Sequence, residues 1–225
     1  MHFEVPKGKL GSLREFMGEY AMIVVSILTA LALEYGVERW HRAHRAEESA
    51  VNMEAEIRAN LQNLTAARLA NQKEAALLTH LLEVLEADLA AKQSDAAIVQ
   101  HFRAEAKDNF TLQLQVTTPR HDAWDAAVAN QSASWIAPDR FLKFSKAYTA
   151  ERSVPELVGG NMSTLLNGPK MIDILTDLDR GVVDPRELLH TVAQMRAVHG
   201  IADAVMANAE HKVLAVFPAA APAAK

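Results

Sequence analysis

Two pairs of glutamate and histidine have a spacing that places both side chains on one face of a helix: Glu38 with His41, and Glu187 with His190. Di-iron carboxylate proteins use this Glu-x-x-His spacing on two helices of a bundle, with glutamates from two further helices. Glutamate and histidine are frequent in this chain, so such pairs are expected by chance. Glu187 also follows Asp184 by three residues, as an acid in the first turn of a helix does. We therefore expect no metal site and no cofactor.

Other motifs of catalysis are missing from the sequence. There is no Gly-x-Ser-x-Gly elbow, no phosphate loop, no dinucleotide fingerprint and no His-Glu-x-x-His zinc motif. There is no cysteine, which excludes disulfides, thiolate catalysis and zinc sites built on sulfur. Basic residues are dispersed and the net charge is −5, so no nucleic-acid partner is expected. These observations favour a protein that is not an enzyme.

An apolar segment near the N-terminus is the most distinctive element. Residues 20–33 carry no charge, and only Glu19 and Glu34 interrupt the run from Phe16 to Val37. As a helix rising 1.5 Å per residue, this run is about 33 Å long, close to the ~30 Å hydrocarbon core of a bilayer. We therefore predict one transmembrane helix and a lipid bilayer as partner.

The flanks of this segment define the predicted helix, to which we assign residues 13–38. Ser12 and Glu15 fit a capping box at its start. Aromatic residues near both ends are expected to be interfacial anchors: Tyr20, Tyr35 and Trp40. A buried helix of a soluble bundle and a cleaved signal peptide are the alternatives. The helical pattern continues through Glu34 to Arg45 without a break, which argues against the signal peptide.

Basic residues lie on both sides of the predicted span, three before it (Lys7, Lys9, Arg14) and three after it (Arg39, Arg42, Arg45). The positive-inside rule is therefore balanced. An outside N-terminus would carry the basic tail across the membrane, so we expect the N-terminus inside and the C-terminal domain outside. With His41 and His44, the second set of arginines is expected to form a collar facing lipid headgroups.

One face of the predicted span combines small and polar residues at a spacing of four: Ser26, Ala30 and Glu34. Small residues let two membrane helices approach closely. A carboxylate on such a face reaches the headgroups, meets a partner, or handles a proton or ion. We expect this face to pack in a homo-oligomer or against a membrane partner protein.

The remainder of the chain predicts an all-α fold. No Gly or Pro occurs between Trp40 and Lys92, and apolar residues recur at spacings of three and four: Ile57, Leu61, Leu64, Leu78, Leu82, Leu85 and Leu89. Residues 39–107 are therefore predicted as a long helical stalk, either a coiled coil or a hairpin turning near Asn71-Gln72. Helix is expected to resume from Ser94 to Ala106.

Residues 108–216 are predicted as a helical distal domain, between tails at residues 1–12 and 217–225. The run from Phe110 to Val116 alternates like a strand without a partner and is interpreted as an extended loop. Helices are expected to start at Thr118-Pro119, to run from Lys170 to Arg180 before Gly181, and to run from Asp184-Pro185 to Val216. Turns are expected at Gly159-Gly160 and at Asn167-Gly168-Pro169.

Aromatic residues gather in the first half of this predicted domain: Trp124, Trp135, Phe141, Phe144 and Tyr148. Such residues most often form a core. A ligand pocket lined by them is the alternative.

The anchor and its flank resemble a set of uncharacterised bacterial single-pass membrane proteins. The residues that carry the resemblance are Ala30-Leu-Ala-Leu-Glu34, Glu38, Trp40-His41, Arg45 and Glu56-Ile-Arg-Ala-Asn60-Leu61, followed by the region around Trp124 and a helix from Phe141 to Tyr148. These are domain-of-unknown-function families with an N-terminal transmembrane helix and a helical extramembrane domain. The resemblance implies an anchored helical domain, here in a bacterial inner membrane, and no activity.

Three functions are compatible with these features. The first is a membrane-anchored helical interaction or accessory protein without catalytic activity, which the sequence favours. The second is a membrane-tethered sensor that binds a small ligand in the aromatic-rich domain. The third is an enzyme, for which no residue can be named.

Overall fold

The computed structural model describes residues 13–106 and 113–218, and their regular structure is helical without strands. The elements run in the order α1 (Leu13–Ala90), α2 (Asp95–Ala106), α3 (Asp122–Ala129), η2 (Ser132–Trp135), α4 (Pro138–Leu165), α5 (Gly168–Arg180) and α6 (Pro185–Val216). The predicted all-α fold with one long N-terminal helix is therefore confirmed. The predicted N-terminal tail, with Ser12 of the capping box, lies outside the described residues.

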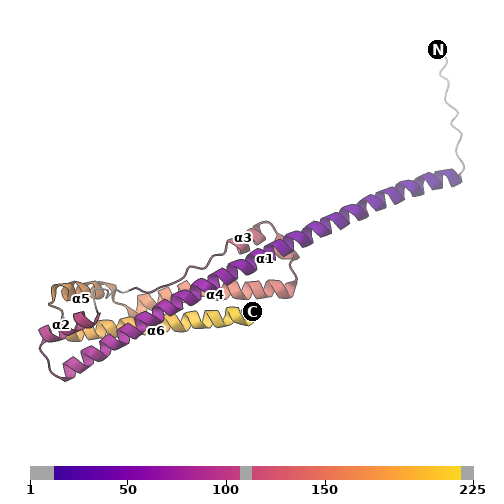
Figure 1. Ribbon diagram of the computed structural model, residues 1–225. Helices are drawn as coiled ribbons and strands as arrows, with labels where there is room; N and C mark the ends of the chain where they lie inside the picture. Colours follow the sequence, from indigo (N-terminus) through magenta and orange to yellow (C-terminus); the bar gives the residue numbers. More distant parts are fainter. Residues whose placement is uncertain (1–12, 107–112, 219–225) are drawn as a thin grey trace, which may run out of the picture.

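The helix α1 is continuous for 78 residues and is the axis of the molecule (Figure 1). The turn expected near Asn71-Gln72 does not exist. Asn71 is fully buried, and its side chain bonds to the backbone of Gln115, so a residue type common in turns is used here for a tertiary contact. The chain turns instead after Ala90, where Lys92 adopts a left-handed φ of 56°.

Two long helices, α4 and α6, lie along the C-terminal two-thirds of α1, with α2 and α5 at the far end (Figure 1). The core forms three clusters, and each combines residues of α1 with residues beyond position 121. Near the exposed part of α1, Met53 and Ile57 pack with Phe144. Leu64 packs with Met206 at the centre, and Leu81 with Leu188 at the far end. The stretches predicted as a stalk (39–107) and a distal domain (108–216) thus share one core.

Residues 113–121, which precede α3, run along α1 without regular secondary structure (Figure 1). This segment, here called the strap, agrees with the loop predicted from Phe110 to Val116 over residues 113–116; residues 110–112 lie outside the described residues. The predicted helix start at Thr118-Pro119 is wrong, because α3 begins at Asp122. The backbone N–H and carbonyl of Arg120 are instead hydrogen-bonded to the side chain of Asn60 in α1.

The later helix ends follow local signals with one exception. Asn167 and Asp184 cap α5 and α6 by accepting hydrogen bonds from Lys170 N and Arg186 N. Gly181 ends α5 with a left-handed φ of 72°, as predicted. The turn predicted at Gly159-Gly160 is wrong, because both glycines lie inside α4.

The C-terminal end of α6 returns towards the exposed part of α1 (Figure 1). Phe217, which was assigned to the predicted tail, is buried and stacks on Phe144 with ring centroids 5.2 Å apart. The rest of that tail, from residue 219, lies outside the described residues.

Candidate functional site

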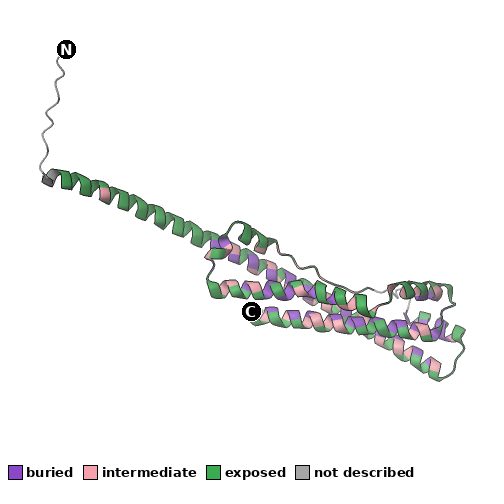
Figure 2. Ribbon diagram, turned by 180° about the vertical axis from the view of Figure 1, so that it is seen from behind, coloured by how far each residue is buried: buried purple, intermediate pink, exposed green. Residues whose placement is uncertain are grey.

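The N-terminal third of α1 is apolar and uncovered. From Phe16 to Arg45 no side chain is buried, and Figure 2 shows this part as exposed almost throughout. Large apolar side chains here are between half and two-thirds exposed, including Met22, Leu28 and Leu33. By length and composition, α1 is the one described helix that could cross a membrane.

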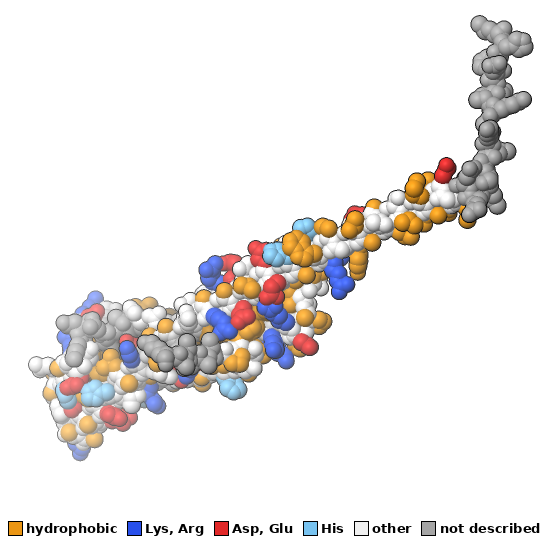
Figure 3. Space-filling model, turned by 45° about the vertical axis from the view of Figure 1, so that its right-hand side comes forward, with side chains coloured by type: hydrophobic (Ala, Val, Ile, Leu, Met, Phe, Trp, Pro, Cys, Tyr) orange, Lys and Arg blue, Asp and Glu red, His pale blue; other side chains and the backbone are white. Residues whose placement is uncertain are grey.

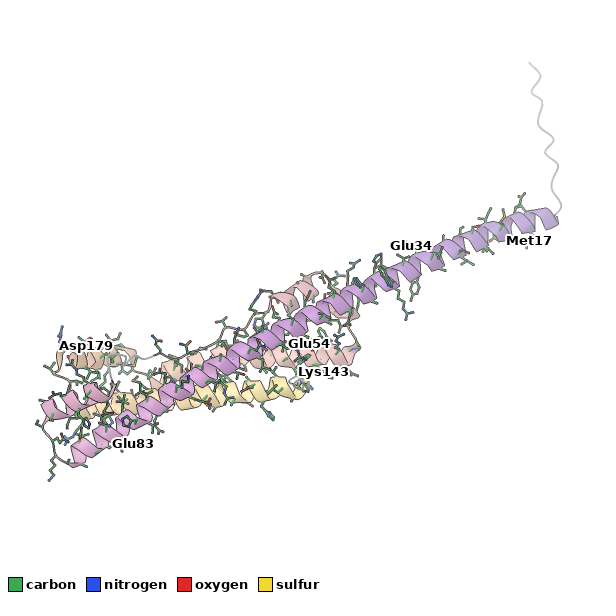
Figure 4. The ribbon with its side chains drawn as sticks, viewed as in Figure 1. Met17, Glu34, Glu54, Glu83, Lys143 and Asp179 are labelled. Atoms are coloured by element: carbon green, nitrogen blue, oxygen red, sulfur yellow. The ribbon has the colours of Figure 1, made fainter. Side chains whose placement is uncertain are left out.

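The predicted packing stripe lies on this uncovered part. Ser26 and Ala30 are exposed, and Ser26 Oγ donates a hydrogen bond to the carbonyl oxygen of Met22, 2.8 Å away. Glu34 is exposed beyond the bundle (Figure 4), and no described side chain forms an ion pair with it. The fold therefore leaves all three stripe residues free of contacts from the bundle.

The three predicted interfacial aromatics are also exposed: Tyr20 by 57%, Tyr35 by 69% and Trp40 by 63%. Trp40 stacks on the ring of His44, with centroids 5.8 Å apart and planes within 6°. On the same stretch the guanidinium carbons of Arg42 and Arg45 lie 5.7 and 5.6 Å from the ring centre of Trp135. The expected collar therefore also includes a tryptophan from a distant part of the chain.

The two Glu-x-x-His pairs do not meet. Glu38 is at the uncovered end of α1 and pairs with Arg42 at 2.8 Å, whereas Glu187 is at the far end and pairs with Lys170. Within the described residues, no three histidine or acidic side chains converge in a way that could hold a metal ion.

A buried polar cluster joins α1 to α4, and sequence reasoning did not identify it as a site. Glu56 accepts a hydrogen bond from the Tyr148 hydroxyl at 2.7 Å and faces the backbone N–H of Ala123 at 3.2 Å. Glu151 is 3% exposed and accepts a hydrogen bond from Asn60 Nδ2 at 2.8 Å. The segments around Glu56 and around Trp124 thus meet in space.

The cluster perturbs its own ionisable groups. The pKa of Glu151 is raised to about 7, mainly by burial; the hydrogen bond from Asn60 opposes the rise and the nearby carboxylate of Glu56 adds to it. Burial and the hydrogen bond to Glu56 raise the pKa of the Tyr148 hydroxyl far above its usual value. Glu151 Oε1 is buried and has no protein partner among the described residues. Glu151 is therefore a neutral carboxyl over much of the acidic range.

Two buried asparagines of α1 hold the strap. The Asn60 amide accepts a hydrogen bond from the N–H of Arg120 at 3.0 Å and donates one to its carbonyl oxygen at 2.9 Å. The Asn71 amide does the same with Gln115, and both of these distances are 2.8 Å. Eleven residues of helix and five residues of extended chain both span about 16 Å. The two lengths match, so both ends of this stretch of the strap are held. The strap runs antiparallel to α1, because the earlier asparagine, Asn60, binds the later strap residue, Arg120.

The sequence contains a signal for these asparagines. The buried positions of α1 follow alternating steps of four and three through Met53, Ile57, Asn60 and Leu64, and the same pattern includes Asn71. A polar residue inside an apolar stripe marks a specific buried contact. The sequence could show that Asn60 needed a partner, but not that the partner was the backbone of Arg120.

The fold and the uncovered segment together define an all-α protein built on one long helix, with one candidate membrane span and a bundle of helices beyond it. Comparisons of the chain with protein-family models, with curated proteins and with solved structures find no match.

Proposed function

We propose that this protein is a single-pass, membrane-anchored helical interaction or accessory protein that works without catalysis. One observation carries the proposal: a single unbroken helix is apolar and uncovered in its first third and is the central helix of a packed bundle in the rest.

The uncovered segment supports a bilayer rather than a covering protein. Its exposed apolar side chains occupy successive positions, including Met22, Ile23, Val25, Ile27 and Leu28, so they point in all directions around the helix. A partner helix covers one stripe of such a surface, whereas lipid covers the whole circumference. Each large apolar side chain left in water would cost about 1.5–3 kcal/mol.

The proposed orientation has the N-terminus inside a bacterial inner membrane and the bundle outside. The chain contains no cysteine, so an introduced cysteine is a unique label. Ile172→Cys, at a position 63% exposed on α5, should react with a membrane-impermeant maleimide in intact cells whose outer membrane is permeable to it. Reaction only after the inner membrane is broken would reverse the proposed orientation.

The sensor alternative has weaker support. The aromatic residues that would line a ligand pocket pack on one another: Trp124 lies 5.3 Å from both Phe141 and Tyr148, measured between ring centroids. Such ring contacts are typical of a packed core, against which these side chains lie.

Two measurements test the proposed function. The full chain should stay in the membrane pellet after an alkaline carbonate wash, and release into the supernatant would refute the anchor. After purification in mild detergent, we expect either a homo-oligomer or a co-purifying membrane protein. A monomer that carries no partner would contradict the interaction role.

A further inference from the structure

One side chain joins the strap to the buried carboxyl of Glu151. The amide nitrogen of Asn60 has two hydrogens, and it donates one to the carbonyl oxygen of Arg120 at 2.9 Å and the other to Glu151 Oε2 at 2.8 Å. Three residues further on, the backbone N–H of Ala123 faces the carboxylate of Glu56 at 3.2 Å. The end of the strap is therefore connected to both carboxyl groups of the cluster.

Glu151 is a buried carboxyl with one unpaired oxygen. It is 3% exposed, and its Oε1 has no hydrogen-bond partner within residues 13–106 and 113–218. Burial raises the pKa of this carboxyl to about 7, so it changes from neutral to charged near neutral pH. A buried charge costs a large free energy until water or an opposite charge reaches it.

The groups that face Glu151 from α1 and from the strap supply no countercharge. From α1 it is the carboxylate of Glu56, which opposes a second negative charge. From the strap, the guanidinium of Arg120 pairs with Asp122 at 2.7 Å, and both side chains are more than two-thirds exposed. The other titratable strap residue, His121, forms no ion pair with a described residue, and its Nδ1 is buried without a partner there.

The helices packed around the cluster supply no countercharge either. Asp125 in α3 brings a further negative charge towards Tyr148, and on α6 the carboxylate of Glu210 pairs with Arg68 of α1. Two other titratable residues of α6 are exposed and line a groove between α4 and α6: His211 and Lys212. Figure 3 shows acidic and basic side chains together on the surface of the half of the bundle that adjoins the apolar helix. A proton that leaves the buried carboxyl therefore leaves an unbalanced charge inside the bundle.

The strap is the part of this region that can open at the lowest cost. Residues 113–121 have no regular secondary structure, whereas α1 and α4 are long helices packed in the core. Asn60 holds the strap at Arg120, and Asn71 holds it at Gln115, about 16 Å away along α1. Segments with few buried contacts open before packed helices do. Opening at the first of these two ends would let water reach the cluster.

We propose that loss of the proton from Glu151 releases the Arg120 end of the strap and leaves the Gln115 end bound, so that the strap is a pH-sensitive switch. The new charge is repelled by Glu56 and gains water when the strap moves away, which offsets the hydrogen bonds that Asn60 makes to Arg120. The switch is built from the bundle alone and does not depend on the proposed membrane anchor.

Hydrogen exchange at single backbone amides of the full chain in mild detergent tests this switch. Asn60 protects the Arg120 N–H, and the Gln115 N–H, which Asn71 protects, is the control within the same molecule. A pKa of about 7 with the strap closed and 4.5 with it open makes opening about tenfold more favourable at pH 8 than at pH 6. Burial lowers the pKa of His199 beside Asn71, so a rising pH removes charge at the control end rather than adding it.

After correction for the intrinsic pH dependence of exchange, we expect protection of the Arg120 N–H to fall about tenfold between pH 6 and 8, and that of the Gln115 N–H not to fall. In Glu151→Gln, which cannot ionise, neither should fall. Unchanged protection at Arg120 would overturn the switch. An equal fall at both amides would show that the whole bundle loosens, which also overturns it. A fall at Arg120 in Glu151→Gln as large as in the wild type would assign the pH response to another group and refute the role of Glu151. The two amides of the wild-type chain decide the test even if Glu151→Gln is unstable.

Discussion

The two parts of α1 are one helix in two surroundings. From Phe16 to Arg45 no side chain is buried and apolar residues point in every direction, whereas from Ala46 onward the buried residues follow steps of three and four on one side. The backbone geometry is the same in both parts, so what differs is the medium that covers the side chains. The spacing of apolar residues around the helix supports the proposal that lipid covers the first part and the bundle covers the second.

Polar residues have different roles in the two parts. In the uncovered part Glu34 forms no ion pair with any described residue, and under the proposed anchor its role depends on what it meets in the membrane. In the covered part Asn60 and Asn71 are buried with their amides paired to the backbone of the strap. Most polar groups inside a packed core are paired by the fold itself, because bulk water does not reach them, and Glu151 Oε1 is an exception here.

The largest expected difference comes from leucine-to-alanine changes in the two parts. Leu81 is fully buried, so Leu81→Ala should lower the free energy of unfolding by about 2–5 kcal/mol. Leu28→Ala in the uncovered part and Leu69→Ala on the exposed face, at 59% and 56% exposure, should change it by about 0.5 kcal/mol or less. Denaturant titration of the full chain, followed by circular dichroism, measures all three. A comparable loss in Leu28→Ala would show that the uncovered part packs against the bundle.

The strap contact is the next test. Asn60→Ala removes hydrogen bonds to Arg120 and Glu151, and we expect a loss of about 2–4 kcal/mol because buried groups lose their partners. Asn63→Ala, on the exposed face of the same helix, is the control. Trypsin should cleave after Arg120 faster in Asn60→Ala than in the control. Equal cleavage rates would mean that the strap is held without Asn60.

The buried carboxyl predicts a pH dependence in the covered part. Glu151 has a pKa of about 7 in the folded chain, compared with an ordinary value of 4.5. Because the folded chain favours the protonated Glu151 carboxyl, this group stabilises the fold fully below pH 4.5. The stabilisation is lost as the pH rises through 7 and the buried carboxyl ionises. Glu151→Gln keeps an acceptor for Asn60 without a titrating proton.

Between pH 4.5 and 8, the free energy of unfolding of the wild-type chain should therefore fall by up to about 3 kcal/mol relative to that of Glu151→Gln. Denaturant titration at each pH measures both. Glu54→Gln is the control, because Glu54 pairs with Arg58 at the surface. Parallel pH profiles for the wild type and Glu151→Gln would show that Glu151 ionises normally.

The smallest effect is expected in the uncovered stripe. Ala30→Ile adds bulk to the proposed helix contact, and Glu34→Gln keeps the size but removes the charge. Each should weaken self-association or partner co-purification by about 1–2 kcal/mol at most, without releasing the protein from the membrane. Leu28→Ala lies off the stripe and should have less effect. Unchanged cross-linking in both stripe variants would mean that this face meets only lipid.

Local signals account for the parts of the fold that were predicted. Asp184 and Asn167 cap helices with their own side chains, and Gly181 takes a left-handed conformation that ends α5. The apolar run before Val37 and the helical spacing after it also follow from nearby residues. These features depend on contacts within a few positions, so the sequence alone determined them.

The tertiary structure decided the features in which distant segments meet. Gly159 and Gly160 are turn formers in isolation, yet α4 continues through them with Val154 and Val158 packed in the core. Asn71 likewise remains helical because Gln115, 44 positions later, satisfies its amide. Glu151 acquires a raised pKa only when the bundle closes around it. In each case the deciding free energy comes from burial against residues far along the chain, and no local pattern records it.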